Sequence, residues 1–349
     1  MSNSISEQPV IGITIGDPAG IGPEIVVKAL AKPEIRKAAK FIIFGSHEHL
    51  AYAADLAEIE PFWFRHQHEK ISRDYPSKVS LADYDDFAIP PYITGPGKIS
   101  GQVSLRFCMD AIEAAKDHII DAVVTAPISK ESWKLAGAKW PGHTELFAEK
   151  TKSPRKAMMF IAGPLKLALA TIHEGLFEVR YKFSIGRVFE PIDLLNTALK
   201  EFFGIPKPRI AVAALNPHAG ENGLFGDEEK RIITPAILLA QQAGINCQGP
   251  FPADSIFHKA LQGRFDAVVA MYHDQGMIPV KLLAWDTAVN VTIGLPIIRT
   301  SPAHGTAFDI AGKNLASSKS MESAIMVAID MAKTKRKNLL QSKVNSDAN

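Results

Sequence analysis

The feature that most constrains the fold is a repeated alternation of short apolar runs with longer amphipathic stretches. Short apolar runs are typical of buried strands, and amphipathic stretches between them are typical of helices. The alternation therefore predicts βα units around a largely parallel sheet. The predicted strands are residues 10–15, 41–44, 122–125, 165–172, 210–215, 267–271 and 288–293. The predicted helices are residues 23–30, 102–116, 190–203, 228–242, 256–261 and 321–332.

The chain has 349 residues, which exceeds one typical domain of about 100–200 residues. No repeat, low-complexity linker or break in composition marks a boundary, so we expect two lobes that interleave rather than follow one another. Residues 58–91 carry scattered aromatic residues without a clear period, which indicates loops and short strands. The polar, basic segment after residue 332 predicts a frayed tail.

Composition excludes several classes of protein. The 39 Lys and Arg residues nearly balance the 37 Asp and Glu residues, so nucleic acid is not an expected partner. No apolar run approaches the ~18 residues of a membrane span, and the N-terminal residues lack the basic and apolar regions of a signal peptide. The only cysteines, Cys108 and Cys247, have no metal or redox spacing. A reducing, cytoplasmic location is therefore expected.

A histidine lies within three residues of the end of three predicted strands. His173 follows residues 165–172, and His218 and His273 follow the strands at 210–215 and 267–271. Ligands bind outside the carboxyl ends of the strands in open parallel sheets. Three imidazoles that converge there, with one open position, would form a catalytic metal site. A single histidine in this position is more often a surface or capping residue, so the prediction depends on all three.

Two further features admit both a functional and a structural interpretation. Asp254 is either an additional oxygen ligand or the N-cap of a helix that begins near Ser255. The segment Gly16-Asp-Pro-Ala-Gly-Ile-Gly-Pro-Glu24 follows the first strand, and its glycines permit a tight turn and the close approach of another group. This segment is either a binding turn or a plain connection to a helix. It is neither a dinucleotide-binding fingerprint nor a Walker motif.

Polar and cationic residues also occur on Gly- and Pro-rich turns. Arginine offers a fork for carboxylate or phosphate, and lysine offers a point charge. Taken singly, such residues are more often solvated surface groups, and their spacing alone does not assemble them into one pocket. The residues concerned are Lys130, His143, Thr144, Lys281, Asn290 and Arg299.

Together these segments resemble the 4-hydroxythreonine-4-phosphate dehydrogenase family of the vitamin B6 pathway, from about Val10 to Ala332. The resemblance implies an α/β, isopropylmalate dehydrogenase-like, two-lobed α/β/α fold with a largely parallel sheet, which binds NAD without the usual fingerprint. One family unit would span residues 8–335, with an NAD-side lobe (1–126 plus 286–335), a central metal, substrate and dimer lobe (127–285) and a tail (336–349). The matching segments begin at Gly16, Pro141 (Pro-Gly-His-Thr-Glu), Leu215 (Leu-Asn-Pro-His-Ala-Gly-Glu), Ala270 (Ala-Met-Tyr-His-Asp-Gln-Gly), Gly294 (Gly-Leu-Pro-Ile-Ile-Arg-Thr-Ser) and His304 (His-Gly-Thr-Ala-Phe-Asp-Ile-Ala-Gly).

The resemblance also implies roles for individual residues. His173, His218 and His273 would hold one divalent metal per site (zinc, magnesium or cobalt), with Asp254 as a further candidate. The site would lie at a homodimer interface, with the metal ligands shared between the subunits. Lys281 is also the candidate proton acceptor. The implied substrate-binding residues are His143, Thr144, Lys281, Asn290 and Arg299, and the implied NAD- or NADP-binding residues are Gly305, Thr306 and Asp309.

The implied activity is metal-assisted, NAD(P)-dependent oxidation of the 3-hydroxyl of 4-hydroxythreonine 4-phosphate, giving a 3-oxo acid that decarboxylates to 3-amino-2-oxopropyl phosphate. The stretch His173-Glu-Gly-Leu-Phe-Glu-Val-Arg departs from the family pattern and, with residues 220–229 and 278–283, resembles a sister branch. That branch oxidises D-threonate or D-erythronate 4-phosphate, so the substituent at substrate carbon 2, amine or hydroxyl, stays open. Other interpretations are a metal-dependent hydrolase or lyase, and a non-catalytic sugar-phosphate- or metal-binding protein.

Overall fold

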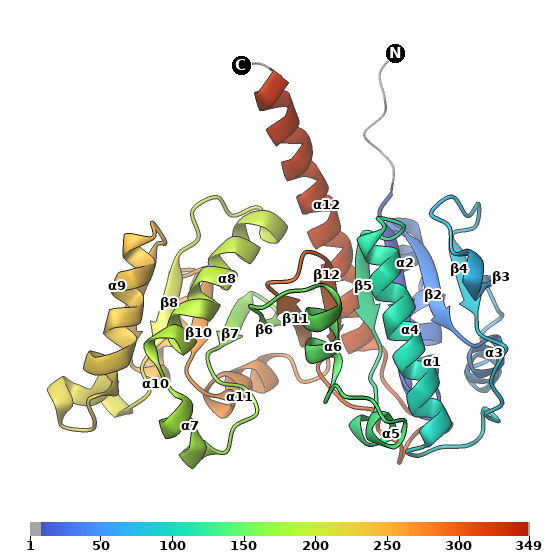
Figure 1. Ribbon diagram of the computed structural model, residues 1–349, viewed down its shortest axis with the longest axis horizontal. Helices are drawn as coiled ribbons and strands as arrows, with labels where there is room; N and C mark the ends of the chain where they lie inside the picture. The colour runs from blue at the N-terminus through green and yellow to red at the C-terminus, as the bar shows by residue number, and fades with distance from the viewer. Residues whose placement is uncertain (1–7, 348–349) are drawn as a thin grey trace. The chain divides into compact units, whose positions relative to one another are not determined.

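The computed structural model describes residues 8–347, which form two compact units (Figure 1). Of the described residues, unit 1 comprises those up to Pro154 and Leu295–Lys333, and unit 2 comprises Arg155–Gly294 and those from Thr334 onward. Residues 1–7, where we expect no signal peptide, lie outside the described part. Among the described residues no helix is long and apolar enough to cross a membrane.

Unit 1 is built on a parallel sheet with the strand order β3-β4-β2-β1-β5-β12. In the central strand, Thr14 lies opposite Phe44 of β2 and Thr125 of β5. The carboxyl ends of these strands therefore share one edge, where ligands bind in such sheets. The strands are β1 (Val10–Thr14), β2 (Lys40–Gly45), β3 (Phe64–Gln67), β4 (Val79–Asp83), β5 (Ala122–Thr125) and β12 (Ile298–Pro302).

Helices connect these strands and cover the sheet of unit 1. The first begins directly after the Gly-rich turn, with Pro23 in its first turn, where a missing backbone N–H costs nothing. The long α4 packs on β1, β2 and β5. The helices of this unit are α1 (Gly22–Ala31), α2 (Pro33–Ala38), α3 (His47–Leu56), the 3-10 turn η1 (His68–Lys70), α4 (Lys98–Lys116), α5 (Lys130–Leu135), α6 (His143–Lys150) and the first part of α12 (Lys319–Asp347).

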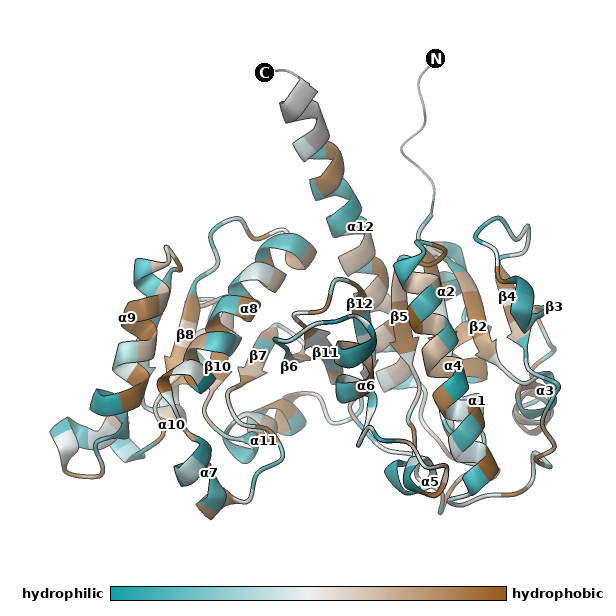
Figure 2. Cartoon of the chain, in the orientation of Figure 1, coloured by the Kyte–Doolittle hydropathy of each residue, from teal (hydrophilic) through white to brown (hydrophobic). Residues whose placement is uncertain are grey.

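Unit 2 contains a mixed sheet with the strand order β11-β6-β7-β10-β8-β9. Its second strand, β6, runs antiparallel to both neighbours, whereas β7, β10, β8 and β9 are mutually parallel. Figure 2 shows that the strands are largely hydrophobic, while the helices carry both polar and apolar residues. The strands are β6 (Ala157–Ala162), β7 (Leu165–Leu169), β8 (Ile210–Ala213), β9 (Cys247–Phe251), β10 (Ala267–Ala270) and β11 (Val289–Ile293).

The helices of unit 2 follow its strands in βα order. Ser184 caps the first turn of α8 by accepting from the Arg187 N–H, and Gly204 ends that helix in a left-handed conformation (φ 64°). Both α8 and α11 pack on β6, β7 and β10. The helices are α7 (Leu176–Lys182), α8 (Ile185–Phe203), η2 (Pro217–Gly223), the π-helical turn η3 (Glu229–Ile233), α9 (Thr234–Gln242), α10 (Ala253–Leu261) and α11 (His273–Leu283).

All seven predicted strands and all six predicted helices occur, and most lie within a few residues of their predicted bounds. The helix predicted at 228–242 begins with the π-helical turn η3, and the helix predicted at 321–332 ends fifteen residues later than predicted. The unit boundaries differ from the predicted lobe boundaries at 126/127 and 285/286. The second boundary lies at Gly294 because β11 pairs with β6 of unit 2. At the first boundary, α5 packs on α4 and Trp133 donates to Ser104. Those contacts keep the residues up to Pro154 in unit 1. The chain predicted as a tail after residue 335 continues α12 as far as Asp347.

Candidate metal and substrate site

Two of the predicted histidine ligands come together in unit 2. Val268 of β10 lies opposite Leu167 of β7, and the same register continues past both strands, where Thr171 donates from its N–H and its hydroxyl to the Met271 carbonyl. His173 and His273 each follow two residues later, so both lie at the same edge of the sheet. As a result the ring centroids of His173 and His273 lie 6.0 Å apart.

Buried residues after β10 hold this arrangement in place. The Gln275 amide accepts from the Met271 N–H and donates to the Ala214 carbonyl, each at 2.7 Å, and so ties the ends of β10 and β8 together. Gly276 lets α11 approach the sheet, because a Cβ there would lie 2.6 Å from Leu167 Cδ2. We did not predict the role of Gln275; its only signal is its place in His-Asp-Gln-Gly, directly after the strand.

The paired histidines line a cavity of about 230 Å³. Its wall is made by the turns after β7 and β10 and by one side of α7. His273 Nδ1 lies 2.7 Å from Asp274 Oδ1, which leaves Nε2 for another contact. This carboxylate–imidazole arrangement is the one that orients histidine ligands in metal sites. The lining residues are Ile172, His173, Glu174, Leu176, Val179, Tyr272, His273 and Asp274.

His218 lies in the strained turn η2, where its φ is 51°. The neighbouring Ala219, Glu221 and Asn222 also have positive φ, which is uncommon for residues other than glycine and often accompanies function. The buried Glu229 fixes the start of this turn. One carboxylate oxygen accepts from the N–H groups of Leu215 and Asn216, at 2.9 and 2.7 Å, and the other accepts from the Asn216 amide.

The described residues of one chain contain no group of three or more His, Cys, Asp or Glu side chains that could hold a metal ion. His218 and Asp254 therefore do not join His173 and His273 in one cluster. Asp254 is exposed and lies in the first turn of α10. The alternative prediction, that it is the N-cap, is wrong, because the helix begins at Ala253 with Pro252 at the N-cap. The donor types of the histidine pair nevertheless fit a divalent metal.

Unit 2 also contains two of the predicted substrate-binding residues, Lys281 and Asn290. Lys281 is on α11, where burial lowers the pKa of its ammonium group, and its Nζ lies 5.4 Å from the Trp285 ring centroid. Asn290 is on β11, and its Oδ1 is buried without a hydrogen-bond partner among the described residues. A buried amide oxygen in that state is suited to a donor from outside the chain.

Unit 1 brings His143 and Arg299 together. Arg299, on β12, is 2% exposed and donates from Nε and Nη2 to the Thr125 hydroxyl. Burial lowers its pKa to about 10, so the guanidinium stays charged at neutral pH. Burial and the nearby Arg299 charge hold the pKa of His143 well below its usual value, and His143 Nε2 is buried with no hydrogen-bond partner in the described part of the chain. With Thr144 beside it at the start of α6, this neutral imidazole and buried cation form a suitable anion site.

The predicted cofactor residues lie against the Gly-rich turn of unit 1. The Thr306 carbonyl accepts from the Ile21 N–H at 3.0 Å. Gly20 permits this close approach, because a Cβ would lie 3.0 Å from both the Cβ and the carbonyl oxygen of Thr306. Gly305 and Asp309 in the same loop are exposed. The structure thus joins two segments that are far apart in the sequence, the turn at residues 16–24 and the loop at 304–312.

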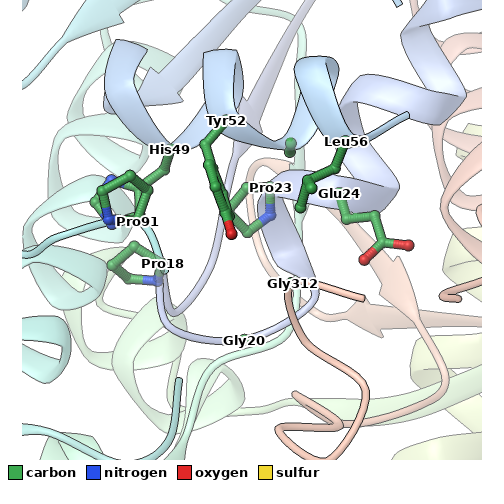
Figure 3. A pocket seen from close by; sticks show the side chains of 10 residues that line it. Pro18, Gly20, Pro23, Glu24, His49, Tyr52, Leu56, Pro91 and Gly312 are labelled. Carbon is green, nitrogen blue, oxygen red and sulfur yellow. The ribbon is translucent and has the colours of Figure 1, made fainter. Parts of the chain in front are cut away.

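A hollow of about 30 Å³ lies between this turn, α3 and Gly312 (Figure 3). The 2%-exposed His49 lines it, with Nδ1 3.1 Å from the Ser46 hydroxyl and with Nε2 lacking a partner among the described residues. Burial lowers the pKa of His49 to about 4, so the imidazole is neutral at neutral pH. We did not predict this residue, since nothing in its sequence context distinguishes it. Tyr52 and Pro18 form neighbouring parts of the wall.

A largely parallel α/β fold with imidazoles at the strand ends and a buried cation in the same chain defines an enzyme-type binding protein for small anionic molecules. Residues 37–328 match the family "Pyridoxal phosphate biosynthetic protein PdxA". The chain belongs to this family. Its named relatives are dehydrogenases, so the chain is an oxidoreductase of that type and uses a nicotinamide cofactor.

Similar proteins cover nearly the whole chain. A 4-hydroxythreonine-4-phosphate dehydrogenase of Geobacter metallireducens is 44% identical over 94% of this chain and 97% of its own. A D-threonate 4-phosphate dehydrogenase of Salmonella typhimurium is 43% identical over 93% of this chain and 100% of its own. The crystal structure of 4-hydroxythreonine-4-phosphate dehydrogenase from Klebsiella pneumoniae has a TM-score of 0.85 and 38% identity over 95% of this chain and 100% of its own. The predicted fold class and family are confirmed.

Proposed function

We propose that this chain oxidises the secondary alcohol of a small hydroxy acid that carries a phosphate. The first candidate substrate is 4-hydroxythreonine 4-phosphate, whose 3-hydroxyl would become a 3-oxo group, with loss of carbon dioxide to 3-amino-2-oxopropyl phosphate. The observation that carries this proposal is the cavity of about 230 Å³ around His173 and His273. Its volume suits a small acid, and its imidazoles suit a divalent metal.

His173, His218 and His273 are the proposed ligands of one zinc, magnesium or cobalt ion, with Asp254 as an additional oxygen donor. A bound divalent metal would acidify the substrate hydroxyl. Because one chain brings only two of the histidines together, we propose that His218 comes from a second subunit of a homodimer. Exposed apolar side chains beside the cavity support such an interface: Phe177 and Tyr181 on α7 are 88% and 78% exposed, and Leu282 on α11 is 82% exposed.

The remaining residues would bind and orient the substrate. Arg299, His143 and Thr144 would hold the phosphate, since a buried guanidinium attracts it and a neutral imidazole does not repel it. Asn290 would accept from a donor group of the substrate. Lys281 would accept the hydroxyl proton, because burial favours its neutral form.

The nicotinamide cofactor, NAD or NADP, would lie along the loop that contains Gly305, Thr306 and Asp309, and the nicotinamide would take the hydride. Contact between this loop and Gly20 supports that position. A cytoplasmic location is proposed because Cys108 and Cys247 are both free and buried.

D-Threonate 4-phosphate is a second candidate substrate. The observation that favours it is Glu174 in the wall of the cavity, paired with Lys182, in the stretch that departs from the family pattern.

The test is absorbance at 340 nm after adding zinc, NAD and each phosphorylated acid to the purified chain. Formation of NADH that depends on both metal and phosphorylated acid is the expected result. Release of inorganic phosphate or cleavage of the acid without NADH would instead identify a hydrolase or lyase. Binding without turnover of any tested acid would identify a non-catalytic binding protein.

A further inference from the structure

A carboxylate in the wall of the histidine cavity forms an ion pair with a lysine outside the wall. Glu174 directly follows His173 and lines the cavity, and its Oε2 lies 2.5 Å from Lys182 Nζ. Glu174 precedes α7 and Lys182 is the last residue of this helix, whose Leu176 and Val179 line the same cavity. The glutamate side chain is 22% exposed and the lysine side chain is 48% exposed. A carboxylate with a fixed cation beside it is therefore part of the surface that faces a bound acid.

Of the two carboxylates in this wall, Glu174 is the less exposed to solvent. Asp274 is the second carboxylate, but its side chain is 73% exposed and one of its oxygens lies 2.7 Å from His273 Nδ1. His173, His273 and Tyr272 complete the polar lining. Solvent screens an exposed charge more strongly than a partly buried one. The Glu174–Lys182 pair should therefore dominate the local field in this wall.

We propose that Glu174 receives the hydrogen bond of the substituent at substrate carbon 2, and that Lys182 tunes the site toward hydroxyl rather than ammonium. The proposal rests on the proposed dehydrogenase function. A hydroxyl and an ammonium can both donate to a carboxylate. The Lys182 cation partly cancels the carboxylate charge and repels a second cation on the same oxygen atoms. An ammonium also loses more hydration free energy than a hydroxyl on entering the cavity.

The test compares kcat/KM for two acids that differ at carbon 2, D-threonate 4-phosphate and 4-hydroxythreonine 4-phosphate, in the metal-loaded holoenzyme. The ratio of the two kcat/KM values in the wild type is the reference for each variant. Lys182→Met exposes the full carboxylate charge and should shift the ratio toward the amino acid by about fivefold. Lys182→Arg should restore the wild-type ratio. Glu174→Gln leaves only the Lys182 cation and should shift the ratio further toward the hydroxy acid.

The matched control is Lys116→Met, which breaks the Lys116–Glu113 pair on α4, outside the cavity. It should leave the ratio unchanged. Calorimetric titration of each acid without NAD gives a second readout, and the affinity ratio should move in the same direction. If Lys182→Met does not fold, the same two ratios are measured for Lys182→Gln and Glu174→Gln.

The inference is overturned if Lys182→Met and Glu174→Gln leave the kcat/KM ratio and the affinity ratio of the two acids within about twofold of the wild-type values. A shift toward the hydroxy acid in Lys182→Met would also overturn it. Absence of NADH with either acid in the wild type would instead reject the proposed dehydrogenase function. The calorimetric ratios would then still decide whether the pair selects the substituent at carbon 2.

Discussion

The ring centroids of His173 and His273 lie 6.0 Å apart although the two residues are one hundred positions apart in the sequence. Their proximity follows from the parallel register of β7 and β10, which Thr171 extends by donating to the Met271 carbonyl. Backbone pairing thus brings the two residues to the same edge of the sheet, and Asp274 also contacts the His273 ring at Nδ1. The pair can therefore be present before any ligand binds, so that binding does not have to order these strands.

Glu229 should control the geometry around His218. Glu229→Gln replaces one acceptor oxygen by an NH₂ group that faces the donor amide of Asn216. The loss of a charge-assisted bond should cost about 1.5–3 kcal/mol, and zinc affinity should fall about 10- to 100-fold, as for other supporting residues of metal sites. Zinc titration measures this. Glu221→Gln, the same change at an exposed residue of the same turn, is the control; equal zinc affinity in both variants would contradict the assignment.

Arg299 should bind phosphate through its fork. Arg299→Lys keeps the charge but loses the planar donors that now contact the Thr125 hydroxyl. The KM for the phosphorylated acid should rise about 10- to 100-fold, the equivalent of one charged hydrogen bond, with a smaller change in kcat. Steady-state kinetics measure both constants. Arg209→Lys, at the exposed pair with Asp266, is the control. An unchanged KM would remove Arg299 from the phosphate site.

Gly20 should be necessary for the position of the cofactor loop. In Gly20→Ala the added methyl group would meet Thr306 at 3.0 Å, and relief of such overpacking costs about 1–3 kcal/mol. The KM for NAD should rise, while zinc affinity stays unchanged because His173 and His273 lie in unit 2. Gly186→Ala is the matched control, since nothing lies within 4 Å of a Cβ at that position. Equal KM values for NAD in the two variants would contradict a cofactor role for this loop.

His49 should make stability depend on pH. Burial lowers its pKa from 6.5 to about 4, so between these values the unfolded chain binds more protons than the folded chain. Above pH 6.5 the neutral imidazole costs the folded state nothing. As the pH falls toward 4, the free energy of unfolding decreases by about 3 kcal/mol, because each pKa unit corresponds to about 1.36 kcal/mol. Thermal unfolding of wild type and His49→Gln at pH 7 and 4.5 checks this. The variant should lose less stability than the wild type on acidification; parallel losses would contradict the burial effect.

The sequence allowed the fold class to be predicted because the central strands are continuous apolar runs. Strand β12 was missed since Ile298–Pro302 contains Arg299, Thr300 and Ser301, which are buried through polar contacts rather than by an apolar pattern. Helix α11 was missed because Gly276 and Pro279 lie inside it. Both residues weaken helix prediction, and in this fold close packing on β7 and β10 compensates.

From the sequence, only the residues that could bind a ligand directly could be predicted for the candidate site. Histidines after strands are visible in a sequence, and two of the three do come together. Gln275 and Glu229 could not be found in this way, because they hold backbone N–H and carbonyl groups whose positions depend on the folded turns. The pairing of Glu174 with Lys182 likewise depends on α7, a seven-residue helix that the sequence pattern did not indicate.

Subunit complementation tests most directly the claim that two subunits build one metal site. His218→Ala and His273→Ala should each be inactive and bind zinc weakly. If His173 and His273 of one subunit meet His218 of the other, a mixed dimer of the two variants contains one intact site. Dissociating and reassociating the two variants should then restore activity and one tightly bound zinc ion in the mixed dimer. A mixed dimer that forms but regains neither zinc nor activity would contradict the account.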